Sequence, residues 1–346
     1  MSLLVHPLSP YTAVGEGHSF AVRGGSRQFN RGIKRDPTIL VTGDRARFAL
    51  MRTLPEDLLD PDLIKLGDGR VRLVLDGRTE WLDTARDAST LFLPHGTAWS
   101  VCSSLVPDLT VDLLVTQAEN WGLVAQVSLT NNGSFAALEL QVEISFGGLA
   151  RCGRTDSAAY FRADDDDPVD NRVVVSGKQV TFSSPAMPDR VVARSLPACR
   201  PVLSGAKAIF TLPVLLQSGE TRAVCLVAGH SGAAADVESR VAQAAPADLL
   251  EECTQYYARL LRSLQIDTPS VALNSGFRTA ILNLEYDYAA PAWLEGFRSA
   301  TESRVSVTFR YINGFLKQAR APAVPAVFPV RPLFCLLFGI TPGKPL

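Results

Sequence analysis

Several features that would identify common functional classes are missing from this sequence of 346 residues. The formal net charge is -1 and there is no long basic run, which argues against a nucleic-acid partner. The six cysteines are widely spaced without a C-x-x-C pair, so neither a zinc site nor a small disulfide scaffold is predicted. We therefore expect reduced thiols, no metal and no cofactor.

No targeting or membrane-spanning segment is recognised either. The N-terminal residues, M-S-L-L-V-H-P-L-S-P, lack the basic and apolar regions of a secretory signal. The longest apolar run near the C-terminus, Leu333 to Ile340, falls far short of the roughly 20 residues that a membrane-spanning helix needs. The sequence thus predicts a cytoplasmic protein without a membrane partner.

Acidic residues are missing from the last part of the chain. No Asp or Glu occurs from Ser303 to Leu346, and six prolines lie between Pro322 and Pro345. Apart from the short alternating piece S-V-T-F-R-Y-I-N-G-F, this part has neither a helical nor a strand period. It is either an extended tail or the end of a truncated or frame-shifted chain, and we prefer the second interpretation.

What the chain has, up to about residue 230, is alternation of apolar and polar side chains. The alternating segments are 71–82, 109–116, 122–133, 137–148, 172–182, 208–216 and 222–229. Asp76-Gly77 and Ser176-Gly177 are predicted to form hairpin turns. Many strands with regular turns and no helices between them predict a large antiparallel β-sandwich.

The period then becomes helical, so we predict a mainly β protein with a C-terminal α part. Residues 234–245 have a helical composition, an amphipathic helix follows Pro246 with Asp248 as its N-cap, and Asp267 to Ser270 start a further helix. The predicted divisions are a sandwich domain at 1–232, linker helices at 233–268, a helix and loop at 269–302 and an irregular tail at 303–346.

Three motifs suggest chemistry but fit a structural role better. G-H-S-G-A, at 229–233, lies where a nucleophile elbow would, yet its last residue is alanine and no histidine follows Ser231, so we predict a turn. The acidic run at 162–171 lacks the order of a calcium-binding EF-hand, and we expect a solvated loop. His95 lies near Trp99, and we predict a buried or interface histidine beside a core aromatic.

The stretch Y-D-Y-A-A-P-A-W-L-E-G-F-R-S, from Tyr286 to Ser299, combines aromatic rings with charged groups. Sugars present apolar faces that stack on flat rings and hydroxyl groups that bond to charged side chains. Pro291 and Gly296 break the preceding helix, so we expect a loop. Aromatic side chains filling the core between two helices remain an equal alternative. The candidate substrate-binding residues are Tyr286, Asp287, Tyr288, Trp293, Glu295 and Arg298.

A β-sandwich followed by S-V-A-L-N-S-G-F-R-T-A-I-L-N-L-E-Y and A-P-A-W-L-E-G-F resembles the front half of a bacterial glycoside hydrolase of the six-hairpin, (α/α)6-barrel type. The segments F-N-R-G-I-K-R-D and L-F-L-P-H-G-T-A-W are similar to the N-terminal β-supersandwich of such enzymes. The resemblance implies that residues 269–302 begin a barrel, that Trp293 and Glu295 contact sugar, and that the substrate is an oligosaccharide or polysaccharide.

The resemblance also bears on activity, because these hydrolases use two carboxylates. The general acid usually lies on a later barrel loop, whereas this chain has no carboxylate after Glu302, so the catalytic residues stay unassigned. Residues 269–346 are also too few for twelve helices. We therefore expect an incomplete barrel without hydrolase activity, prone to self-association through exposed helices. The alternative is a non-catalytic carbohydrate-binding or assembly sandwich.

Overall fold

The computed structural model divides into two units, Met1–Ala300 and Thr301–Leu346, and the residues that it describes all belong to the first. The described residues are 20–23, 29–33, 36–44, 46–53, 63–85, 88–93, 95–118, 121–134, 137–152, 166–168, 170–187, 189–232, 236–263, 265–270, 273–274, 277, 288–289 and 292–293. The irregular tail expected at 303–346 lies outside them, and the predicted domain divisions stay a prediction.

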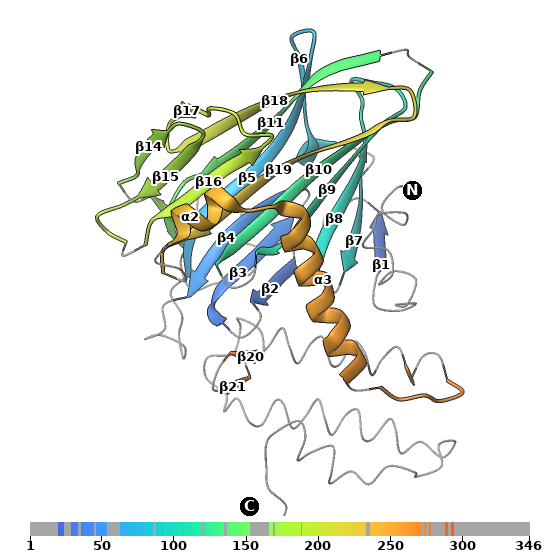
Figure 1. Ribbon diagram of the computed structural model, residues 1–346, viewed down its shortest axis with the longest axis vertical. Helices are drawn as coiled ribbons and strands as arrows, with labels where there is room; N and C mark the ends of the chain where they lie inside the picture. The colour runs from blue at the N-terminus through green and yellow to red at the C-terminus, as the bar shows by residue number, and fades with distance from the viewer. Residues whose placement is uncertain are drawn as a thin grey trace, which may run out of the picture. The chain divides into compact units, whose positions relative to one another are not determined.

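The alternating segments form two antiparallel sheets, which Figure 1 shows stacked on one another. The first has nine strands in the order β1-β7-β8-β9-β10-β19-β16-β15-β14. Their bounds are β1 Phe20–Arg23, β7 Ala88–Leu93, β8 Gly96–Cys102, β9 Leu109–Ala118, β10 Gly122–Asn131, β14 Arg172–Ser176, β15 Gln179–Ser183, β16 Val191–Leu196 and β19 Thr221–His230.

The second sheet has ten strands, seven of them in the order β17-β18-β11-β5-β4-β3-β2. Strands β6 and β12 also pair with β5, and β13 pairs with β12. The bounds are β2 Phe29–Ile33, β3 Asp36–Asp44, β4 Arg47–Thr53, β5 Leu63–Leu75, β6 Arg78–Trp81, β11 Ala137–Gly147, β12 Ala150–Cys152, β13 Asp166–Pro168, β17 Val202–Ser204 and β18 Lys207–Gln217. The predicted sandwich is confirmed.

Two hairpin turns show how the local sequence sets the register. Asp76 and Gly77 have φ angles of 50° and 76°, as a two-residue turn with positive φ at both positions requires, and the predicted turn is confirmed. The second prediction was wrong by one residue, because Ser176 still pairs with Gln179 and the turn is Gly177-Lys178. Gly177 supplies the positive φ, at 61°, so the glycine had to be the first turn residue.

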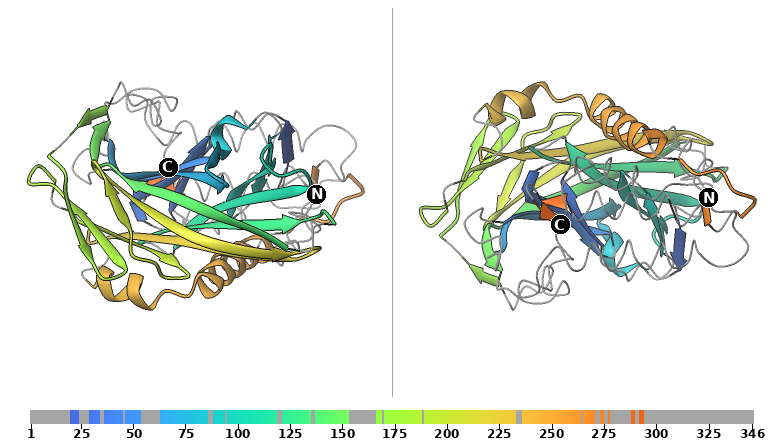
Figure 2. Two further views of the ribbon diagram at one scale, coloured as in Figure 1. Left: turned by 90° about the horizontal axis from the view of Figure 1, so that it is seen from above. Right: turned by 90° about the horizontal axis from the view of Figure 1, so that it is seen from below.

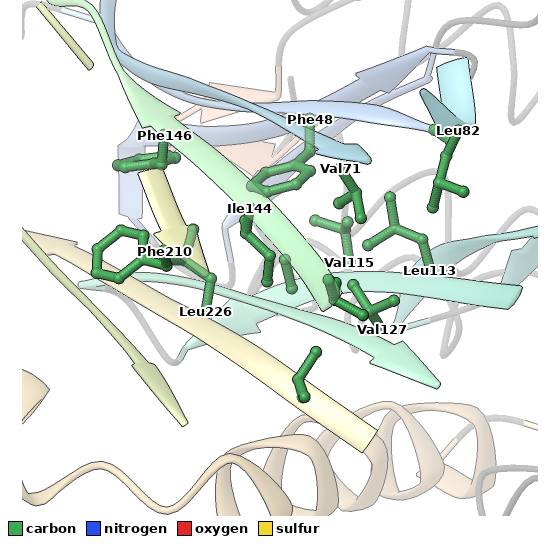
Figure 3. Close-up of a cluster of buried hydrophobic side chains, with 14 of the residues drawn as sticks. Phe48, Val71, Leu82, Leu113, Val115, Val127, Ile144, Phe146, Phe210 and Leu226 are labelled. Atoms are coloured by element: carbon green, nitrogen blue, oxygen red, sulfur yellow. The ribbon is translucent and has the colours of Figure 1, made fainter. Parts of the chain in front are cut away.

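The core lies between the two sheets and is filled by apolar side chains from both of them (Figure 3). In β18, for example, every second residue from Ala208 to Leu216 is buried, and the residues between them are not. The Phe48 and Phe146 rings are stacked with centroids 6.3 Å apart, and Phe182 meets Phe146 edge-on at 6.0 Å. Each such aromatic side chain contributes a large apolar area to the core.

Two helices cover the outer face of the nine-stranded sheet (Figure 2). Helix α2, Val237–Gln243, packs Val237 and Val241 against Val124, Val192 and Val227. Helix α3, Pro246–Ser263, packs Leu250 against Leu93, Ala98 and Leu114. Within the described residues, no helix is long and apolar enough to cross a membrane.

The start of α3 differs from the prediction. The helix begins at Pro246, and the Asp248 amide donates a hydrogen bond to the Ala245 carbonyl at 3.1 Å, so Asp248 lies inside the first turn and is not the N-cap. Proline suits the first helical position, where no N–H partner is needed, and the carboxylate still complements the helix dipole.

The helix predicted to begin at 267–270 starts as expected. The Asn274 amide donates to the Ser270 carbonyl at 3.1 Å, and the Leu273 amide to the Ser270 hydroxyl at 3.3 Å. Leu273, Asn274 and Phe277 are helical, and the remainder of this segment lies outside the described residues. Ser270 therefore serves as the cap that its residue type suggests.

The acidic run at 162–171 is not entirely a loop. Asp166–Pro168 form strand β13, in which Asp167 is opposite Arg151 of β12. The side-chain amide of Asn171 holds the next turn by bonding to both the amide and the carbonyl of Leu149, at 2.9 and 3.0 Å. In the described part of the chain, no group of three or more His, Cys, Asp or Glu side chains is arranged to hold a metal ion.

A buried carboxylate, Glu80, connects the two sheets where β6 lies next to the turn between β8 and β9. Glu80 of β6, in the ten-stranded sheet, accepts hydrogen bonds from the Ser103 hydroxyl at 2.7 Å and the Ser104 amide at 2.9 Å, in the turn between β8 and β9. Burial raises the pKa of Glu80, but these hydrogen bonds and a weaker one from the Leu105 amide outweigh it, so the net pKa is lowered.

We predict that Glu80→Gln destabilises the protein at pH 7 by about 1–3 kcal/mol, because the buried donors lose an ionised acceptor. A lowered pKa in the folded state gives stability that is fully present above the unfolded pKa and is lost as pH falls through the folded value. Urea unfolding at pH 7 and near pH 3 should therefore show a difference from wild type that shrinks in acid. Glu139→Gln, exposed on β11, is the control; an equal effect in both variants would contradict the prediction.

Candidate functional site

The aromatic stretch selected from the sequence contains a small hairpin. Strands β20 (Tyr288–Ala289) and β21 (Ala292–Trp293) pair antiparallel, with Tyr288 opposite Trp293 and Ala289 opposite Ala292. Residues 290 and 291, which come between the two strands in the sequence, lie outside the described residues. The described residues of the predicted loop are therefore two short paired strands, with two aromatic residues at opposed positions.

The other four candidate residues, Tyr286, Asp287, Glu295 and Arg298, lie outside the described residues. The sugar-binding role of all six candidate residues stays a prediction.

The hairpin lies at one end of the sandwich. Strand β20 contacts β3, and β3 in turn contacts β9 of the opposite sheet (Figure 1). At one end of the nine-stranded sheet the inner face becomes polar, with Thr97, Gln117 and His230 all buried. Thr97, for instance, precedes Ala98, which packs beneath α3, so alternation places Thr97 on the face toward the other sheet.

His95 joins this polar end to helix α3 through its backbone. Its carbonyl accepts hydrogen bonds from the Thr116 hydroxyl and, at 3.7 Å, from the Cys253 thiol of α3. The Oγ1 atom of Thr116 and the Sγ atom of Cys253 are 3.4 Å apart. His95 is 1% exposed and Trp99 is fully buried, so the predicted burial of the histidine and the core position of the tryptophan are confirmed.

Ser231 has a structural role. Its hydroxyl accepts a hydrogen bond from the Arg190 amide at 3.0 Å, and its own amide donates to the Arg190 carbonyl at 2.9 Å. These bonds close the turn after β19 against the start of β16. The geometry agrees with the turn expected in place of a nucleophile elbow.

The outer face of the ten-stranded sheet carries a network of charged residues. None of them is among the candidate residues predicted from the sequence. Asp68, Arg70 and Arg72 of β5 alternate with residues that point into the core, such as Val71 and Leu73. Three charges at every second position of a strand are a signal in the sequence itself, because they mark a polar face. The sequence does not tell which charges meet across strands.

Asp68 is the centre of the network and is almost completely buried. Its Oδ2 accepts a hydrogen bond from Lys207 Nζ at 2.7 Å and lies 3.5 Å from Arg47 Nη2, and its Oδ1 is 3.9 Å from Lys65 Nζ. Arg47 also connects the network to Asp83, because its Nε lies 3.8 Å from Asp83 Oδ2. One buried carboxylate thus balances several cations.

The same face carries Trp81, next to two arginines. Arg70 donates to both oxygens of Asp83, at 2.9 and 3.0 Å, and Arg72 donates through Nε to Glu143. The guanidinium carbons of Arg70 and Arg72 lie 4.1 and 5.1 Å from the centroid of the Trp81 ring. Both distances are within the range of cation–π contact.

These contacts limit what the described carboxylates can do chemically. Asp68, Asp83 and Glu143 are ion-paired, and Glu80 is held by hydroxyl and amide donors. A glycosidase needs one protonated carboxyl group with a raised pKa and a second carboxylate across a cleft. Among the described residues these four are therefore structural acids.

Neither a family model nor a curated protein matches this chain. Among solved structures, the chain is similar to a protein named as a kojibiose phosphorylase from the human microbiome, at 9% identity and a TM-score of 0.50, over 80% of this chain and 42% of that one. It therefore spans less than half of that protein's length. The similarity shows the fold, the large antiparallel sandwich that the sequence predicts.

Weaker similarities extend to two further structures. One is a family GH92 inverting mannosidase from Bacteroides thetaiotaomicron, at 10% identity and a TM-score of 0.35, over 78% of this chain and 34% of that one. The other is a GalM/aldose epimerase homologue from C. elegans, at 9% identity and a TM-score of 0.37, over 60% and 99%. Similarities this low carry no argument about function.

We predict that Asp68→Asn destabilises the protein by about 3 kcal/mol, because it removes the buried charge that balances Lys207, Arg47 and Lys65. The loss in free energy of unfolding is measured at pH 7 by thermal or urea unfolding, without guanidinium chloride. The matched control is Glu220→Gln, which breaks the more exposed pair with Arg222 and should change stability by less than about 1 kcal/mol. Equal losses would show that burial of Asp68 has no special effect.

Proposed function

We propose that this chain is the sandwich part of a carbohydrate-active protein and that residues 286–298 contact the sugar. The observation that carries the proposal is the tight β20–β21 hairpin at the end of a sandwich whose fold is shared with a protein named as a kojibiose phosphorylase. Fold alone does not determine function, so the proposal depends on the chemistry of the hairpin segment.

The hairpin supports sugar binding in two ways. Its register places Tyr288 and Trp293 at opposed positions, so two aromatic residues of the segment occur side by side on neighbouring strands. The flanking residues Asp287, Glu295 and Arg298 supply the hydrogen-bonding groups that sugar hydroxyls need. We infer a site for a neutral pyranose unit of an oligosaccharide.

We further propose that this chain binds sugar without hydrolysing it. Hydrolysis needs two carboxyl groups roughly 5 to 9.5 Å apart on either side of the glycosidic bond. Among the described residues, Asp68, Asp83 and Glu143 are paired with cations, and Glu80 is held by hydroxyl and amide donors. A general acid would have to come from another part of the protein or from a partner.

The second candidate function is a carbohydrate-binding or assembly module without any catalytic partner. It is favoured by the same commitment of Asp68, Asp83 and Glu143 to ion pairs, which makes the sandwich face rigid and polar. The two candidates differ in where sugar binds: at the hairpin in the first, and on a sheet face in the second.

Binding of kojibiose and maltotriose to the full chain, measured by titration calorimetry, tests the proposal. We predict that Trp293→Ala lowers the affinity about tenfold, because a stacking ring is lost, whereas Trp293→Phe retains most of it. Reducing-sugar release should stay at the level of a protein-free blank.

The control is Tyr256→Ala, which removes a half-buried ring from α3, away from the hairpin. Saturable binding that is unchanged in Trp293→Ala would move the site elsewhere. Turnover of either sugar by the purified chain would overturn the non-catalytic part of the proposal.

A further inference from the structure

Trp81, Arg70 and Arg72 form a preorganised surface that differs from the hairpin in position and chemistry. They lie on the β5–β6 hairpin, on the outer face of the ten-stranded sheet, with Trp81 and Arg72 directly opposite each other. Each guanidinium is fixed twice, by the indole ring and by a carboxylate, Asp83 for Arg70 and Glu143 for Arg72. Little rotational freedom remains to be lost on binding.

Both arginines keep unused hydrogen-bond donors. Arg72 bonds to Glu143 through Nε, and in the described part of the chain neither of its Nη groups donates to another residue. Arg70 uses Nε and Nη2 on Asp83, which leaves Nη1. The side chains are 31% and 29% exposed for Arg70 and Arg72, so solvent reaches them. A fixed guanidinium with a free pair of Nη groups suits two-point binding of a carboxylate, sulfate or phosphate group.

The ion pairs of the two arginines limit which class of ligand can bind here. Asp83 and Glu143 neutralise the two arginines, so a small inorganic anion gains little from Coulomb attraction alone. Trp81 is half-buried, so the part of its indole that the two guanidinium groups do not cover adds an apolar surface beside the donors. A ligand that offers both an anionic group and an apolar ring face makes use of both features.

We propose that Trp81, Arg70 and Arg72 bind an acidic saccharide, with the sugar ring against the part of the indole that the arginines leave uncovered and its anionic group on the free N–H groups of Arg72 and Arg70. The inference does not depend on the hairpin site, because it uses other residues on another part of the sandwich. The shared chemistry is a negative charge carried on a pyranose, either as a uronate carboxylate or as a phosphate ester.

Titration calorimetry of the full chain with trigalacturonate, glucose 6-phosphate and maltotriose tests the proposal. We expect saturable binding of one or both acidic probes, at least about tenfold tighter than maltotriose and weakened by added salt. Trigalacturonate alone would identify the uronate as the ligand group, and glucose 6-phosphate alone the phosphate ester. Equal binding of the neutral trisaccharide, or inorganic sulfate competing as well as the acidic sugars, would overturn the proposal.

Variants then locate the site. Arg72→Gln and Trp81→Leu should each reduce the affinity about tenfold, and Arg72→Lys, which keeps the charge but loses the two-point fork, should fall between. The matched control is Arg222→Gln, an exposed arginine that is paired with Glu220. Thermal melts confirm that each variant is folded, and Arg72→Lys decides the outcome if the larger changes unfold the chain.

Trp293→Ala separates this site from the hairpin. If Trp293→Ala leaves the binding of the acidic probes unchanged and Arg72→Gln reduces that binding, the Trp81 site is supported independently of the proposed function. If Arg72→Gln and Arg72→Lys both bind the acidic probes like wild type, the inference is wrong.

Discussion

The packing of two antiparallel sheets through Phe48, Phe146 and Phe210 is the constraint on which the rest of this protein depends. Because successive residues of a strand point to opposite faces, burying one face of β5, β11 and β18 leaves the other face available for charges. The core also leaves almost no room at its glycines: a Cβ at Gly69 would lie 2.1 Å from the Phe48 ring. The rigid sandwich therefore confines functional chemistry to its ends and outer faces.

Polar contacts at the margins then fix how the sheets and helices are joined. Glu80 connects the β5–β6 hairpin to the β8–β9 turn, and Arg194 of β16 donates to the Ala242 and Ala244 carbonyls at the end of α2. The network around Asp68 connects β4, β5 and β18 on the outer face. Such buried charges are costly without partners, so each one fixes the position of the side chains around it.

The two proposed sugar sites are positioned by different kinds of contact. The Tyr288–Trp293 ladder is formed by backbone pairing and lies next to β3. The Trp81 surface is placed by side chains, since Asp83 and Glu143 orient the arginines that contact the ring. The proposed ligand is a neutral sugar for the first site and an acidic sugar for the second.

The sequence by itself determined the antiparallel sandwich, the Asp76-Gly77 turn, the buried His95 and the start of the helix at Ser270, because alternation and turn or cap chemistry are local properties. It placed the turn after Ser176 one residue early and the cap of α3 at Asp248, since several neighbouring residues satisfy the same local rule. Only the tertiary structure decided that Tyr288 lies opposite Trp293 and that Arg70 and Arg72 meet Trp81. Those pairs depend on strand register, which the packing of the whole sheet sets.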